Sequence, residues 1–304
     1  MQEIIPLIEE NWRKSAVAGR HEVAVRNVDT ISIEKLLPDL VSADNIVFTC
    51  FTVKLCRIGE LIRKTFGLEG RYIIYLHNQA TILCWPIHIW GMGRELRTTD
   101  VFISTCKPDA RAFQYSFDGA RIETVPFTIQ GLKKEYRAAP LNRKELPFVY
   151  VGRISDQKNL HTLIYAFRIF REKNPDTKWR LDIFGRDDDL GSPNMGLYAS
   201  FYSAYLRKLV KLLGLQKYVR FRGYRKRELI QREIQRRRHI AVSASLHSDE
   251  NFGMAPFRSL IFGNLAVLTR WGGYSDFSER FGSQVFPVEA EESAKGPYVD
   301  PLKF

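Results

Sequence analysis

The sequence has few cysteines and no arrangement of cysteine and histidine that is typical of a metal site. None of its four cysteines forms a C-x-x-C pair, and its six histidines lack the spacing of zinc ligands. The cysteines are therefore predicted to be free thiols, as is usual in a reducing compartment. We expect the protein to hold no metal.

The sequence also lacks a signal peptide and an uninterrupted membrane-spanning segment. Its N-terminus has no basic start followed by an apolar core. The stretch 72–93 carries no formal charge, but polar residues and a proline interrupt it. It is better explained as a buried strand followed by a polar loop and an aromatic-rich segment. These absences favour a cytoplasmic protein, and peripheral attachment to the inner face of a membrane stays open.

What the sequence does contain fits a globular protein with a basic surface. The chain has 304 residues, which is enough for two domains of ordinary size. Its contents of 45% hydrophobic and 26% charged residues exclude a long disordered chain, a collagen-like chain and a coiled coil. The net charge of +12 favours anionic partners, namely nucleotides, phosphorylated lipids, membrane surfaces or nucleic acid.

Patterns of strands and helices alternate along the chain, which predicts an α/β fold with parallel sheets. In the first half, strands are predicted at 22–25, 45–48, 72–76, 101–104 and 122–126, with helices at 4–18 and 55–66. In the second half, strands are predicted at 148–151, 179–184, 219–221, 240–244 and 266–268, with helices at 159–171, 206–213, 227–237 and 256–262. The polar stretch 133–146 is predicted to be a linker, so that the two domains span 1–132 and 147–304.

The strongest motif begins with the predicted strand 148–151. Gly152 and Arg153 follow this strand, and Lys158 comes just before the next predicted helix. Glycine allows a close approach of the backbone to a ligand. A guanidinium, an ammonium group and a helix N-terminus together suit a diphosphate. The alternative is an ordinary strand–loop–helix unit with solvated charges.

A second motif follows the predicted strand 240–244. Glu250 precedes Phe252, Gly253 and the next predicted helix, which places this acid at the carboxyl edge of the sheet. Glycines at 263, 272 and 273 mark tight turns further along the chain. The alternative is a loop-rich surface on which one acid has no particular role.

Taken in this order, the two motifs resemble the C-terminal domain of retaining glycosyltransferases of the GT-B fold. The resemblance is particularly to glycosyltransferase family 4, also called glycosyl transferases group 1, and it covers roughly residues 147–290. It implies an α/β protein with two Rossmann-like doubly wound domains that face a cleft, in a form shortened at both ends. The matching residues are Gly152, Arg153, Lys158, Glu250, Phe252, Gly253, Gly263, Gly272 and Gly273.

The resemblance implies the transfer of a sugar from a nucleotide-diphosphate sugar to a saccharide or lipid-linked acceptor, with retention of configuration. Glu250 and His77 would be the catalytic residues, with His77 on the acceptor side. Gly152, Arg153 and Lys158 would bind the donor diphosphate. The residues implied to contact the donor sugar or nucleotide are Phe252, Gly253, Met254, Arg258 and Tyr224. No cofactor or metal is implied.

One position departs from the family pattern. Where the family has a second glutamate, this sequence has Arg258. The family's acid is implied to hold the ribose hydroxyls, and a guanidinium cannot accept their hydrogen bonds. Arg258 would instead contact a phosphate or pair with Asp249 or Glu250. The departure keeps a second hypothesis open, a non-catalytic GT-B relative that binds a glycan, a lipid or a protein partner.

The surplus of positive charge is concentrated in two places. Nine basic residues and two glutamates lie between Arg220 and Arg238, which suits a solvated helix face or a lipid-facing patch. In the first half, basic residues on or beside the predicted helix 55–66 accompany nearby tryptophans, which suits an anionic membrane surface. These residues are Lys54, Arg57, Arg63, Lys64, Trp85, Trp90 and Arg94. Nucleic acid is a disfavoured partner, because the sequence has no helix-turn-helix, RNP-type or zinc-finger motif.

Overall fold

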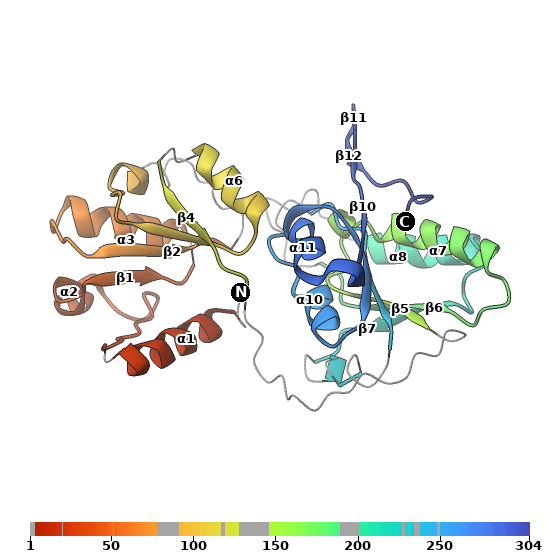
Figure 1. The fold of residues 1–304 in the computed structure, drawn as a ribbon, viewed down its shortest axis with the longest axis horizontal. Helices are drawn as coiled ribbons and strands as arrows, with labels where there is room; N and C mark the ends of the chain where they lie inside the picture. Colours follow the sequence, from red (N-terminus) through yellow and green to blue (C-terminus); the bar gives the residue numbers. More distant parts are fainter. Residues whose placement is uncertain are drawn as a thin grey trace. The chain divides into compact units, whose positions relative to one another are not determined.

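The protein is described by a computed structural model that covers residues 4–19, 21–50, 52–77, 91–116, 119–127, 146–188, 201–226, 229–230, 232–233, 238–247 and 250–304. The chain divides into two compact units, unit 1 with residues 1–130 and unit 2 with residues 131–304. Each unit contains its own parallel sheet and its own hydrophobic core (Figure 1). The predicted linker 133–146 and the predicted helix 227–237 lie largely outside the described residues.

The sheet of unit 1 has four parallel strands in the order β1-β2-β3-β4. The strands are β1 (Asn45–Phe48), β2 (Arg71–Tyr75), β3 (Val101–Ser104) and β4 (Arg121–Thr124). The helices described in this unit include α1 (Ile4–Gly19), α2 (Ile33–Val41), α3 (Val53–Lys64) and α6 (Lys107–Ser116). All four strands overlap strands that the sequence predicts.

Alternating side chains along β2 explain how the helices are layered on this sheet. Tyr72 and Ile74 are fully buried in a cluster that includes Ile62 of α3. The adjacent Tyr75 accepts a hydrogen bond from the indole N–H of Trp12 in α1, at 3.1 Å. Figure 1 accordingly shows α1 on one side of the sheet and α3 and α6 on the other. The sheet is therefore covered on both faces.

The prediction of a strand at 22–25 is wrong. Residues 21–27 form neither helix nor strand, and their side chains are partly or fully exposed. A strand needs a hydrogen-bonded neighbour and a buried face, and no described strand of unit 1 pairs with this segment. The sequence patterns also fail to predict α6 and α2, of which α2 contains Pro38.

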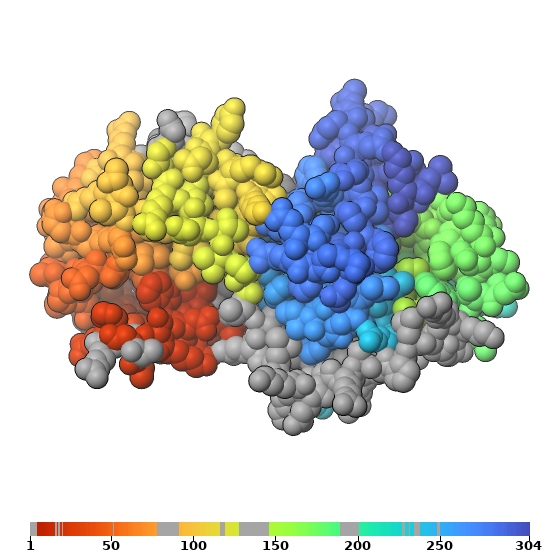
Figure 2. Space-filling model, in the orientation of Figure 1, coloured from red at the N-terminus to blue at the C-terminus, as the bar shows by residue number. Residues whose placement is uncertain are grey.

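The sheet of unit 2 has six parallel strands in the order β10-β9-β8-β5-β6-β7. They are β5 (Pro147–Val151), β6 (Arg180–Phe184), β7 (Val219–Gly223), β8 (Ile240–Ser243), β9 (Leu265–Thr269) and β10 (Val285–Val288). The main helices are α7 (Leu160–Lys173), α8 (Tyr202–Leu212), α10 (Met254–Ile261) and α11 (Phe277–Phe281). An antiparallel hairpin of β11 (Glu291–Ser293) and β12 (Gly296–Tyr298) projects from this unit (Figures 1 and 2). The predicted α/β fold with parallel sheets is confirmed.

One part of the core of unit 2 lies between the sheet and the helices α7 and α8. Ile183 of β6, Leu160 of α7 and Leu206 of α8 are fully buried in it. Burial of a side chain of this size contributes roughly 1.5–3 kcal/mol. On the opposite face, α10 and α11 cover the sheet (Figure 1), and Phe257 packs against Phe277 there. Because both faces are covered, the inner strands β5, β8 and β9 have nearly continuous apolar sequences.

The order of the strands determines where unit 2 can bind a ligand. From β5 the chain proceeds to β6 and β7 on one side, and it then places β8, β9 and β10 on the other side of β5. The switch point therefore lies between β5 and β8. Ligands of open α/β sheets bind at the carboxyl ends of the strands beside such a point. The segments that follow β5 and β8 are the ones that contain the two sequence motifs.

One basic residue expected on a membrane-facing surface is instead part of the interior of unit 1. The Arg63 side chain is 1% exposed and donates hydrogen bonds to both carboxylate oxygens of Asp100, at 2.5 and 2.7 Å. The same guanidinium lies 3.6 Å from the centre of the Tyr72 ring. The expectation that Arg63 contacts a membrane is therefore wrong, because its charge is paired inside the unit.

Two other basic residues of α3 form ion pairs at the surface of unit 1. Lys54 pairs with Asp29, and Lys64 pairs with Glu60 one helical turn away. The two tryptophans, at 85 and 90, are outside the described residues. Within the part of the chain that the structure describes, no helix has the length and apolar character needed to cross a membrane.

Candidate functional site

Backbone hydrogen bonds hold the first motif at the carboxyl end of β5. The N–H of Gly152 donates to the carbonyl of Phe184, the last residue of β6, at 3.0 Å. The Tyr150 hydroxyl donates to the carbonyl of Arg153 at 2.7 Å. A Cβ atom at position 152 would lie 2.6 Å from this hydroxyl oxygen, which explains the glycine. The Arg153 side chain therefore begins from a well-fixed backbone.

The Arg153 guanidinium contacts two side chains that were not among the predicted site residues. Its Nη1 donates to Oδ2 of Asp188 at 3.0 Å, and its Nη2 lies 3.3 Å from Nε2 of His247. A guanidinium has only donors, so Nε2 of His247 is the acceptor. Burial and the charges of Lys158 and Arg153 lower the pKa of His247 to about 3, although Glu250 opposes them. His247 is therefore neutral at pH 7, with its proton on Nδ1.

Lys158 and Glu250 connect the first motif to the second. The Lys158 ammonium donates to Oε2 of Glu250 at 2.6 Å, and the two side chains are 13% and 10% exposed. The Ser245 hydroxyl donates to the same oxygen at 2.8 Å. Burial acts to raise the pKa of the Glu250 carboxyl, but the charge of Lys158 and the two hydrogen bonds hold this pKa below its ordinary value. Glu250 is therefore ionised at pH 7.

Two tight turns hold the loop that contains Glu250. Gly253 has a φ of 77°, and a Cβ atom there would lie 2.1 Å from an aromatic ring of the core. The N–H of Gly273 donates to the carbonyl of Glu250 at 2.5 Å. The indole N–H of Trp271 donates to the carbonyl of His247 at 3.0 Å. The segment 271–273 therefore supports the main chain of His247 and of Glu250.

We call the group of Arg153, Lys158, Asp188, His247 and Glu250 the switch-point cluster. Its members follow the carboxyl ends of β5, β6 and β8. Two basic side chains are matched by two carboxylates, and the histidine is neutral, so the cluster carries no net charge. Arg153 is 34% exposed on its side chain and can be reached from solvent. The cluster can bind an anion if the anion replaces a carboxylate as the partner of a basic side chain.

The remaining predicted donor contacts differ in how they can reach a ligand. The Phe252 side chain is 1% exposed and packs edge-on against other aromatic rings, so only its main chain can contact a ligand. Met254 is the first residue of α10, and Arg258 lies in the last turn of that helix. Tyr224 directly follows β7 and is 69% exposed.

His77 lies in unit 1, just beyond the carboxyl end of β2. Its Nε2 donates to the carbonyl of Thr49 at 2.5 Å, and its ring stacks between Tyr75 and Phe127. Its Nδ1 is buried and has no hydrogen-bond partner among the described residues. Burial lowers the pKa of His77, so the ring is neutral at pH 7 with Nδ1 as an acceptor. The two predicted catalytic residues, His77 and Glu250, therefore belong to different units.

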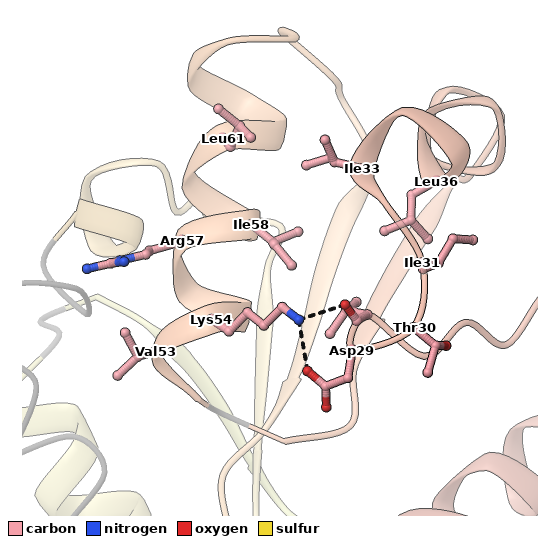
Figure 3. A pocket seen from close by; sticks show the side chains of 11 residues that line it. Asp29, Thr30, Ile31, Ile33, Leu36, Val53, Lys54, Arg57, Ile58 and Leu61 are labelled. Carbon is pink, nitrogen blue, oxygen red and sulfur yellow. Dashed lines mark hydrogen bonds and ion pairs between the residues drawn. The ribbon is translucent and has the colours of Figure 1, made fainter.

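Unit 1 also contains a pocket of about 650 Å³ between α2, α3 and the segment 28–31 (Figure 3). Ile58 of α3 and Ile33 of α2 face each other across it. The Lys54 ammonium closes one end and pairs with Asp29 at 2.8 Å. The pocket is therefore mainly apolar, with an exposed ion pair at its edge. None of the predicted site residues lines it.

The switch-point cluster includes groups that local sequence patterns do not reveal. Asp188 and His247 are 35 and 94 residues away from Arg153, the residue that they contact. Their position after the ends of β6 and β8 is the one signal that the sequence offers for them. Across the described ranges, no set of three or more His, Cys, Asp or Glu side chains is placed to hold a metal ion.

Solved structures that resemble this chain are glycosyltransferases of the GT-B fold. The lipopolysaccharide outer core galactosyltransferase WaaB has a TM-score of 0.57 and 17% identity, over 79% of this chain and 60% of that one. Trehalose-6-phosphate synthase from E. coli with bound UDP-2-fluoro glucose has a TM-score of 0.60 and 15% identity, over 84% and 64%. Sucrose-phosphate synthase from Thermosynechococcus elongatus has a TM-score of 0.57 and 18% identity, over 85% and 67%. The chain thus spans less than two thirds of the length of the first two proteins.

Comparison by sequence identifies the family. No curated protein sequence matches the chain. The family model described as glycosyl transferases group 1 matches residues 133–295, which is more than half of the chain. The matched region contains both sequence motifs and the switch-point cluster, and the resemblance inferred from those motifs is confirmed. The chain therefore belongs to the glycosyl transferases group 1 family.

Proposed function

We propose that this chain transfers a sugar from a nucleotide-diphosphate sugar to an acceptor, and that the switch-point cluster binds the donor diphosphate. The observation that carries this proposal is that Arg153 and the ion pair of Lys158 with Glu250 follow the carboxyl ends of β5 and β8. Two basic side chains with a carboxylate suit a phosphate next to a sugar hydroxyl. Family membership and the UDP-sugar analogue bound by a related structure support the proposal.

Donor binding exchanges partners within the cluster. The diphosphate replaces carboxylates as the partner of Lys158 and Arg153. Glu250 then loses its ammonium donor and accepts hydrogen bonds from sugar hydroxyls, while Ser245 continues to orient it. When the bond between sugar and diphosphate breaks, negative charge develops on the leaving group, and the two basic side chains stabilise it. This arrangement needs no metal and no cofactor.

The N-terminus of α10 and the end of β7 supply further donor contacts in this proposal. Gly253 caps α10 and Met254 begins it, so their N–H groups lie at the positive end of the helix dipole, near the phosphate or sugar. Arg258 takes a phosphate contact in place of the family's contact to ribose. Tyr224, exposed after β7, lies near the nucleotide base.

The acceptor side of the proposed reaction belongs to unit 1. The buried Nδ1 of His77 can accept a hydrogen bond from an acceptor hydroxyl. The acceptor is a saccharide or a lipid-linked saccharide, and configuration is retained, as the family resemblance implies. Cys50, Cys56 and Cys106 form no disulfide in the described part of the chain, which supports a reducing, cytoplasmic setting, with the inner membrane face as the place of a lipid-linked acceptor.

A screen of donors tests the proposal. The protein is incubated with UDP-, GDP-, ADP- and TDP-linked sugars, and the products are detected by mass spectrometry. We expect release of a nucleoside diphosphate from at least one donor, and nuclear magnetic resonance of the new glycosidic bond should show retention. If no donor turns over and calorimetric titration detects no nucleoside diphosphate, the second hypothesis of a non-catalytic GT-B relative is favoured instead.

A further inference from the structure

Asp188 places a negative charge where an anionic ligand is proposed to bind. Its side chain is 9% exposed, and its Oδ2 accepts a hydrogen bond from Arg153 at 3.0 Å. Its other oxygen, Oδ1, is buried and has no hydrogen-bond partner among the residues that the structure describes. Buried carboxylate oxygens are normally hydrogen-bonded, so this half-satisfied group requires an explanation. The predicted diphosphate contacts do not provide one.

Backbone hydrogen bonds tie the main chain at Asp188 to the segment that follows β5. Its N–H donates to the carbonyl of Ile154 at 3.2 Å, and the N–H of Ile154 donates to the carbonyl of Arg186 at 2.8 Å. An isolated parallel bridge joins Ile154 to Asp187. The segments after β5 and β6 are therefore tied together. The main chain at Asp188 is therefore held near Arg153, from which its carboxylate accepts a hydrogen bond.

Asp188 and Glu250 differ in the hydrogen bonds that remain to them when a ligand binds. Glu250 exchanges Lys158 for sugar hydroxyls and remains hydrogen-bonded to Ser245. Among the described residues, the Asp188 carboxylate accepts its hydrogen bond from Arg153, and a phosphate at that guanidinium competes with it directly. Charges interact more strongly in a partly buried site than in water, so the competition includes repulsion between phosphate and carboxylate. A fixed repulsive group of this kind is a means of discriminating between ligands.

We propose that Asp188 sets the charge preference of the switch-point cluster by competing with phosphate groups for Arg153. The inference rests on the proposed function, because it assumes that a diphosphate binds there. A sugar esterifies the terminal phosphate of the donor, so the donor carries less negative charge than the free diphosphate that leaves. Asp188 therefore weakens the binding of the product more than that of the donor. It acts as a specificity-determining residue that favours product release.

Isothermal titration of matched variants tests this inference. The probes are inorganic pyrophosphate, UDP, GDP and ADP, titrated into the wild-type protein and into Asp188→Asn, Asp188→Glu and Asp187→Asn. Asp187→Asn is the control, because it makes the same change in net charge at an exposed neighbouring position. We expect Asp188→Asn to bind the diphosphates about tenfold more tightly than wild type. Asp188→Glu keeps the charge and should retain wild-type affinity, and Asp187→Asn should change affinity by about twofold or less.

The outcomes separate this inference from the proposed function. If the wild type binds a diphosphate and Asp188→Asn binds it with equal or lower affinity, the role of Asp188 is overturned. The proposed function is then unaffected. Equal tightening in Asp188→Asn and Asp187→Asn also overturns it, since net charge then explains the effect. Absence of diphosphate binding in the wild type and in every variant overturns the proposed function, and the inference with it. Thermal unfolding of each variant establishes that the folded proteins are being compared.

Discussion

Two arginine–aspartate pairs, one from each unit, are built differently. In unit 1, Arg63 and Asp100 are each 1% exposed and joined by two hydrogen bonds. In unit 2, Arg153 is 34% exposed, it makes one hydrogen bond to Asp188, and one oxygen of Asp188 has no partner in the described part of the chain. The first pair lies within the core, and the second lies at the carboxyl end of β5. A buried pair in which both carboxylate oxygens accept from the guanidinium is suited to a structural role, whereas an exposed pair joined through one carboxylate oxygen is suited to exchange its partner for a ligand.

The largest effect is expected in the switch-point cluster. Lys158→Ala removes the ammonium proposed to stabilise the leaving diphosphate, so we expect transfer to fall by about 10²–10³-fold. Steady-state turnover of the best donor measures this, and Lys208→Ala, at an exposed lysine of α8, is the control. Full turnover in Lys158→Ala would remove this residue from the proposed donor site.

The buried pair in unit 1 should respond through stability instead. Arg63→Ala leaves Asp100 buried without its ionic partner, which is expected to lower the free energy of unfolding by about 3–5 kcal/mol. Denaturant unfolding measures the loss, with Arg71→Ala on the exposed start of β2 as the control. At low denaturant, pyrophosphate affinity of the folded fraction should stay at its wild-type value. A loss below about 1 kcal/mol would show that the buried pair does not stabilise the unit.

The free energy of unfolding should fall below neutral pH, because His247 is protonated more readily in the unfolded chain than in the folded protein. Its pKa lies near 3 in the folded protein and near 6.5 when exposed, so between these values the unfolded chain binds a proton that the folded protein does not. Stability therefore falls as the pH drops below 6.5, by roughly 2 kcal/mol between pH 7 and pH 5.

Unfolding curves at several pH values, for wild type and His247→Gln, isolate this contribution. The variant should show a flatter dependence between pH 7 and pH 5, and His21→Gln, at an exposed position, should follow the wild type. Identical slopes in wild type and His247→Gln would contradict the neutral, acceptor state assigned to this histidine.

The smallest effect is expected at the exposed pair beside the pocket of unit 1. The Lys54 and Asp29 side chains are 53% and 76% exposed. Exposed pairs contribute about 0–1 kcal/mol, and salt screens them. Lys54→Ala should therefore change the free energy of unfolding by less than about 1 kcal/mol. A larger loss of stability that persists at high salt would show that this pair stabilises the unit as a buried pair does, and would contradict its description as a surface pair.

Strands were predicted well where several buried apolar residues lie close together in the sequence. The segments 45–48, 148–151 and 179–184 coincide closely with β1, β5 and β6. The segment 22–25 contains three consecutive apolar residues but pairs with none of the described strands, and pairing depends on the rest of the fold. Tertiary context therefore decides the assignment of short, exposed segments.

The site residues that follow predicted strand ends could be predicted from the local sequence. The contacts between residues far apart in the sequence could not be predicted in this way. Arg153, Lys158 and Glu250 follow strand ends that the sequence indicates, and Lys158 does meet Glu250. The partners of Arg153 in space come from segments far along the chain. The burial of Arg63 was missed for the same reason, because Asp100 is 37 residues away. A charge pattern along the sequence cannot distinguish a solvated basic residue from a paired one.

Hydrogen exchange followed by mass spectrometry tests the central claim most directly, that the switch-point cluster of unit 2 binds a nucleoside diphosphate. Amide exchange is compared with and without UDP, GDP or ADP at saturating concentration. We expect slower exchange in peptides covering 152–158 and 250–254, which contain Arg153, Lys158 and the start of α10, and in the peptide that contains Tyr224. Protection that appears only in unit 1, or none with a nucleotide that demonstrably binds, would contradict the account.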